Sequence, residues 1–123
     1  MTVIEIIQKI DEIKPNTLSQ EEKMRFLTTV DQTVKKQIID NHVGGESVGF
    51  APYTDGTSLD RELLVPSPFD DIYLYWVAAQ IDYWNDEIEG YNNNMGMYTN
   101  AYNEFANDYR RTHMPIGNQI KFF

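Results

Sequence analysis

The segment PFDDIYLYWVAAQIDYWNDEIEGYNNNMGMYTNAYNEFANDYRRT, residues 68–112, contains both tryptophans and seven of the eight tyrosines of the chain. In its second half, large apolar side chains alternate at steps of four and three residues, which places them on one stripe of a helix. The members are Trp84, Ile88, Tyr91, Met95, Tyr98, Tyr102, Phe105 and Tyr109. The first half carries a separate stripe, and the two lose phase near residues 84–86. The pattern predicts two helices, about 67–83 and 85–112, packed face to face as a hairpin.

Residues at the ends of these two helices predict where each begins and stops. Ser67 before Pro68 is a favourable N-cap followed by a proline at the first helical position. Asn85 or Asp86 could cap the second helix, across either a full reversal or a kink. The aromatic stripe predicts a packed core. Eight tyrosines, however, exceed what a small core can hide, so we expect some to lie where another chain covers them.

The N-terminal half predicts two further helices. Isoleucine and valine at helical spacing indicate a helix that closes before Pro15. Ser19 and Glu22 fit a capping box that opens a second helix, about 19–41, and the Gly44-Gly45 pair ends it. The expected fold is therefore all-α, a compact four-helix domain over residues 1–112 with a C-terminal tail, residues 113–123.

Residues 46–66 form an irregular arm between the second and third helices, because they lack helical periodicity. Connections of this length in a compact domain are often functional. The arm either crosses the surface between helices or projects to contact a neighbouring subunit, and its Asp55-Gly56 pair predicts a turn that could close a small irregular hairpin. The candidate partner-binding residues in the arm are Phe50, Tyr53, Leu63 and Leu64.

The tail supplies a second set of candidate partner-binding residues. They are His113, Met114, Ile116, Ile120, Phe122 and Phe123. Aromatic side chains are costly to leave in water, so the tail should fold back on the domain or insert into a partner.

Composition limits the function classes. The chain has 123 residues, which suits one domain, and a formal charge of -9 with a pI near 4.5. An acidic chain opposes binding to phosphate backbones, which makes a DNA-recognition module a poor expectation. Lacking cysteine, the chain has neither disulfides nor thiolate chemistry. No apolar run approaches the ~20 residues of a membrane span, and the start does not resemble a signal peptide, so we expect a soluble intracellular origin.

Motifs of catalysis are missing from the sequence. Its two histidines, His42 and His113, stand on different segments without a Glu-x-x-His pair, a His-Glu-x-x-His motif or a serine elbow. Asp82, Asp86 and Glu89 could line one helical edge and bind a hard cation, but an acidic chain offers many such triples. We expect a protein that is not an enzyme and that carries no cofactor or metal.

The run LLVPSPFDDIYLYWVAAQIDYWNDEIEGYNNNMGMYTNAYNEFANDYRRTHMP, with KPNTLSQEEKMRFL near the start, resembles a family of small head–tail connector proteins of Firmicutes tailed phages and prophages. The resemblance spans about residues 4–115. It is strongest in Leu64-Val65-Pro66, in the segments 79–83 and 91–93, and in Tyr109 through Pro115.

This resemblance implies a helical adaptor in the neck of the virion, made in the bacterial host cytoplasm. Such an adaptor docks on the portal ring, repeats around it, contacts downstream neck and tail-completion proteins, and extends the DNA channel toward the tail. Negative charge facing that channel would keep passing DNA from sticking. The alternative is an acidic helical regulator or inhibitor that mimics nucleic acid or binds a host protein.

Overall fold

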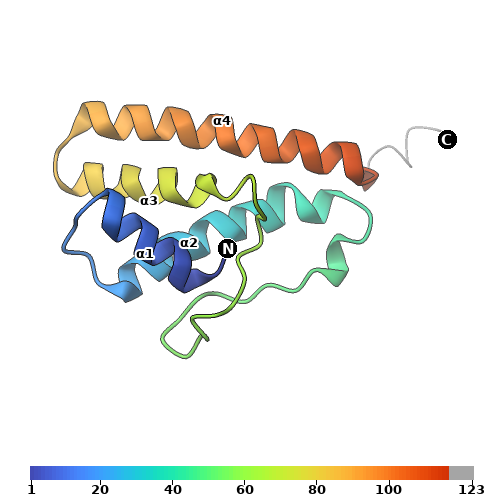
Figure 1. The fold of residues 1–123 in the computed structure, drawn as a ribbon. Coiled ribbons are helices and arrows are strands. Elements are labelled where there is room, and N and C mark those ends of the chain that lie inside the picture. The colour runs from blue at the N-terminus through green and yellow to red at the C-terminus, as the bar shows by residue number, and fades with distance from the viewer. Residues whose placement is uncertain (117–123) are drawn as a thin grey trace.

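The structure, a computed structural model, describes residues 1–116 and builds them from four α-helices and two short 3-10 helices (Figure 1). The helices are α1 (Val3–Ile13), α2 (Gln20–Gln37), α3 (Asp71–Trp84) and α4 (Ile88–Thr112), with the 3-10 helices η1 (Ile39–Asn41) and η2 (Gly45–Ser47). Over these residues the chain forms no β-strand, only two isolated bridges, Thr2 with Glu62 and His42 with Pro115. The all-α prediction is confirmed.

Helix α3 is the centre of the fold. It contacts the other three α-helices, whereas α4 packs mainly along α3, on the side away from α1 and α2 (Figure 1). A helix covered on most of its faces must be apolar on most of them. The buried residues of α3 accordingly follow no single stripe: Ile72, Tyr73, Val77, Ala78, Ala79, Ile81 and Asp82.

Side-chain caps start the first two helices. Thr2 and Glu5 form a reciprocal capping box on α1, an N-terminal signal that the sequence analysis missed. At α2 the Ser19 hydroxyl accepts from the Glu22 N–H at 3.1 Å as predicted. The Glu22 carboxylate does not complete the predicted box, because it accepts from Arg25 at 2.7 Å instead. The α-helical part of α2 ends at Gln37, and η1 continues to Asn41.

The predicted hairpin is present, and the turn between α3 and α4 is a full reversal (Figure 1). Its caps differ from the prediction. Ser67 is not the N-cap, because its hydroxyl donates to Asp70 Oδ2 at 2.8 Å and α3 begins only at Asp71. Asn85 closes the C-terminus of α3 rather than opening α4. Asp86 takes a left-handed φ of 57°, and Glu87 occupies the N-cap position of α4 without a side-chain cap.

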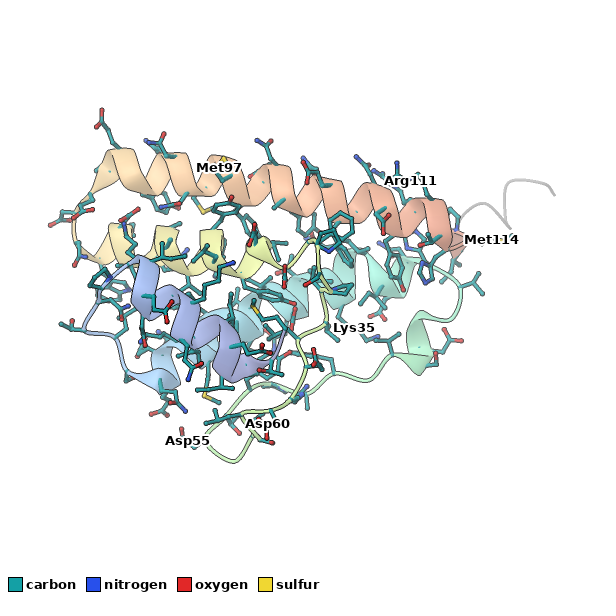
Figure 2. All side chains as sticks on the ribbon, viewed as in Figure 1. Lys35, Asp55, Asp60, Met97, Arg111 and Met114 are labelled. Atoms are coloured by element: carbon teal, nitrogen blue, oxygen red, sulfur yellow. The ribbon has the colours of Figure 1, made fainter. Side chains whose placement is uncertain are left out.

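The arm packs along the chain's own N-terminal segment. Leu59 and Arg61 accept backbone hydrogen bonds from Ile4 and Val3, each at 3.0 Å, and Leu63 donates to Met1 at 3.1 Å. The Asp55-Gly56 turn is confirmed by a Thr57 N–H to Thr54 carbonyl bond of 2.8 Å, although no strands flank it. The turn and the neighbouring Asp60 lie on the loop farthest from α4 (Figure 2). Most of the arm is therefore a surface crossover and not a projection.

Candidate protein-interaction surface

The most exposed apolar surface lies at the turn of the α3–α4 hairpin, residues 82–91, which we call the hairpin tip. Tyr83 and Trp84 are each 64% exposed, and Ile88 is 70% exposed. Together with Tyr91 and neighbouring acids they line a pocket of about 270 Å³. The pocket is slightly smaller than the ~300–1,000 Å³ of a typical small-molecule site, and it suits one or two side chains of a protein partner. Clustered apolar exposure of this kind makes the hairpin tip a candidate interaction surface.

A buried polar cluster holds the hairpin tip in shape. The Asp82 carboxylate is fully buried; it forms an ion pair with Lys14 and accepts from Asn94 Nδ2 at 2.8 Å. Gly90 makes room for this carboxylate, because a Cβ there would lie 2.6 Å from Asp82 Oδ2. The end of α1, the end of α3 and the start of α4 are thereby tied together beneath the exposed side chains. A partner would meet a preformed surface at the tip.

The hairpin tip is also acidic. Residues 82–91 contain four carboxylates and no lysine or arginine, and Asp86, Glu87 and Glu89 are exposed. The three acids that could have lined one helical edge, Asp82, Asp86 and Glu89, do not form a cation site, because the Asp82 carboxylate is bound by Lys14 and Asn94. Within residues 1–116 no group of three histidine or carboxylate side chains could hold a metal ion. The lining of the tip pocket therefore combines apolar side chains with carboxylates.

The opposite end of α4 carries the complementary charge. Arg110 and Arg111 are exposed in its last turn, and residues 109–123 contain three lysines or arginines and no acid. Arg111 and Met114 lie at the end of α4 far from the hairpin turn (Figure 2). Of the predicted tail residues, His113, Met114 and Ile116 are exposed. Ile120, Phe122 and Phe123 lie outside the described residues.

Backbone and ring contacts anchor the start of the tail to the domain. The His113 ring stacks on Tyr109 with centroids 3.7 Å apart, and Tyr109 packs edge-on against the His42 ring at 5.0 Å. Val43 donates its N–H to the Met114 carbonyl at 2.8 Å. The tail therefore leaves the domain from a defined position at the basic end of α4.

The predicted arm residues contact this chain's own core. Tyr53 and Leu63 are buried, while Phe50 and Leu64 are half-buried. The Tyr53 hydroxyl donates to Asp31 Oδ2 at 2.5 Å, and the Arg61 guanidinium lies 4.5 Å from the centre of its ring. Partner binding by these residues stays a prediction. Only Phe50 and Leu64 retain enough exposed surface to contribute directly.

Asp31 joins three separate segments inside the core, and sequence reasoning missed this role. Its carboxylate accepts from the Tyr53 hydroxyl of the arm, from the Tyr73 hydroxyl of α3 at 2.5 Å and from the Leu64 N–H at 3.2 Å. Burial raises the pKa of the Asp31 carboxyl, and burial beside Asp31 raises the pKa of both tyrosines. The sequence signal that could have indicated this role is the position of Asp31 itself, an acidic residue on the apolar face of α2.

The aromatic stripe of α4 is a partial core. Phe105 alone in α4 is fully buried; Tyr98, Tyr102 and Tyr109 are half-buried, and Ile88 is exposed. Tyr98 packs against Trp76 of α3 with ring centroids 4.9 Å apart, and burial raises its pKa to about 12. The Tyr102 hydroxyl donates to Gln37 Oε1 at 2.5 Å. The prediction of a packed core holds for the middle of α4 and is wrong for its start.

No protein-family model, curated protein or solved structure matches the chain. Among the described residues no helix is both long enough and apolar enough to cross a membrane.

Proposed function

We propose that this protein is a structural subunit of a tailed-phage virion, a head–tail connector that docks on the portal ring and repeats around it. It extends the DNA channel toward the tail and contacts the next neck or tail-completion protein. The choice of this assembly rests on the resemblance that spans about residues 4–115. A helical domain with a long surface hairpin is compatible with that role.

The observation that carries the proposal is the exposure of apolar side chains at both ends of the α3–α4 hairpin. Trp84 and Ile88 lie at one end, and Val43 and Ile116 lie at the other, and all four are exposed. Surfaces of this kind on a small domain favour protein partners over small-molecule ligands. A subunit of an assembly needs such contact surfaces, whereas an enzyme needs a convergent set of reactive groups.

Charge supports a passive role toward DNA. The formal charge of -9 opposes binding to phosphate, so a channel built from these subunits would let DNA pass without specific contacts. Such a subunit needs no cofactor. It would be made in the cytoplasm of the bacterial host and end in the neck of the virion, between capsid and tail.

The test is co-assembly with the portal protein encoded in the same genome. The full chain, co-expressed with that portal, should elute with the portal ring in gel filtration and add density to one end of the ring in electron micrographs. The Met97→Ser variant should bind the portal as the wild-type chain does. Met97 is an exposed apolar residue in the middle of α4, away from both ends of the helix (Figure 2).

Elution apart from the portal at every ratio, with bare portal rings, would contradict the connector proposal. Binding to a basic host protein in place of the portal would then favour the acidic regulator. Gene order is a further check, since a connector gene should lie between the portal and capsid genes on one side and tail genes on the other.

A further inference from the structure

We propose that the hairpin tip of one copy binds the C-terminal segment of a second copy, residues 117–123 (GNQIKFF), so that copies join head to tail. The occupant of the pocket beside Trp84 and Ile88 would be the apolar side chains of this segment, chiefly Phe122 and Phe123. This inference rests on the proposed function, because a connector must repeat, and it names the two surfaces through which it does so.

Reach excludes the segment of the same copy. Helix α4 contains 25 residues, which at 1.5 Å per residue separates its two ends by about 37 Å. Ile116 stays at the far end, because Pro115 bridges to His42. Seven residues beyond Ile116, even fully extended, span at most ~24 Å. Phe122 and Phe123 therefore cannot reach the hairpin tip of their own chain, and only the tip of another copy is open to them.

Charge selects the same pairing. The lining of the pocket includes Asp86 and Glu87, Glu89 follows them in the sequence, and no basic residue lies within residues 82–91. The segment 117–123 carries Lys121 and no acidic side chain, although the chain as a whole is strongly acidic. Arg110 and Arg111 precede it in the last turn of α4, where Arg111 also pairs with Asp108 at 3.6 Å. Two identical tips would repel each other, whereas the Lys121 ammonium of a neighbouring segment is attracted to the acidic tip.

The resulting contact uses different surfaces on the two copies. Such a heterologous contact repeats, and it closes into a ring or extends into a filament depending on the rotation between copies. The preformed tip lowers the ordering cost on one side of the contact. In such an assembly, each copy uses the hairpin tip at one end of α4 for one contact and the segment beyond the other end of α4 for the next.

Two full-length variants test the pairing by complementation. The tip variant carries Trp84→Ser and Ile88→Ser, and the tail variant carries Phe122→Ser and Phe123→Ser. Each should be a monomer in sedimentation velocity at concentrations where the wild-type chain and the Met97→Ser control form species larger than dimers. Mixed in equal amounts, the two variants should form a dimer and nothing larger, because only one intact tip and one intact segment can meet.

Several outcomes would overturn the inference. They are a wild-type chain that stays monomeric at every concentration, variants that associate as the wild type does, and a mixture that stays monomeric. Circular dichroism and thermal melting show whether the variants fold, and the changes at the exposed Trp84 and Ile88 should leave the melting temperature almost unchanged. Portal binding by a chain that does not self-associate would leave the connector proposal standing and remove only the head-to-tail contact.

Discussion

Helices α2 and α4 carry similar apolar stripes and end up in different surroundings. Helix α2 buries seven of its 18 residues, whereas α4 buries one of its 25. The cause is the number of elements that cover each helix. Helix α2 contacts α1, α3 and the arm, which reaches it through Tyr53 and Leu64, whereas α4 packs mainly along α3. Stability therefore depends on α2 and on the buried Asp31, whereas α4 keeps apolar surface that the rest of the described chain leaves exposed.

The largest expected effect comes from Asp31→Ala, which should lower the free energy of unfolding by about 4 kcal/mol. Two tyrosine hydroxyls and the Leu64 N–H lose their acceptor, and each buried donor left unpaired costs ~1–3 kcal/mol. Urea denaturation followed by circular dichroism measures the loss. The matched control is Asp40→Ala, which removes a partly exposed ion pair with Lys35 and should cost ~0–1 kcal/mol. Equal losses in the two variants would contradict the role of Asp31.

An intermediate effect is expected from a pair of glycine substitutions within α4. Gly90→Ala should lower the free energy of unfolding by about 2 kcal/mol, because the added methyl would lie 2.6 Å from the Asp82 carboxylate. Gly96→Ala should raise it by up to ~1 kcal/mol, because position 96 is open and alanine favours the helix. The same denaturation experiment compares them. Two stabilising substitutions would show that the start of α4 is not held by Asp82.

A smaller effect is the pH dependence that Asp31 contributes. Burial raises the pKa of Asp31 in the native state above its ordinary value of 3.8. At a pH between the ordinary pKa and the native pKa, the native state therefore holds a proton that the unfolded state has released. The contribution of Asp31 is then fully present below pH 3.8 and is lost as the pH rises through the native pKa. The difference in unfolding free energy between wild type and Asp31→Asn should shrink from pH 3 to pH 7.

Asp11 provides the opposite sign as a control. Its hydrogen bond with Lys23 lowers the pKa of the Asp11 carboxyl, so its contribution is present above the ordinary pKa of 3.8 and is lost as the pH falls through the lowered value. The difference between wild type and Asp11→Asn should therefore grow from pH 3 to pH 7. The same sign for both variants would show that burial does not dominate at Asp31.

The helices could be predicted because the spacing of apolar residues along the sequence is a local signal. Which elements would pack over each helix could not be predicted, because that depends on contacts between distant residues. The hairpin, its phase break near Trp84 and the closing of α1 before Pro15 follow from residues near one another in the sequence. The burial of Tyr53 does not, because it requires Asp31, 22 positions away, as a partner. The exposure of Trp84 and Ile88 could not be predicted from the sequence either. Both residues belong to the same apolar stripe as later residues of α4 that pack against α3. The start of α3 was misplaced because Ser67 bonds to Asp70 and not to a helix N–H.

The most direct test of the head-to-tail account is a cysteine pair, which this cysteine-free chain permits without background. A full-length chain with Ile88→Cys and Phe122→Cys, treated with a mild chemical oxidant, is analysed on a non-reducing gel. Head-to-tail pairing predicts a ladder of dimers, trimers and larger species that collapses on reduction, while either single variant yields at most dimers. An oxidised product that remains a monomer, with or without an internal disulfide, would contradict it.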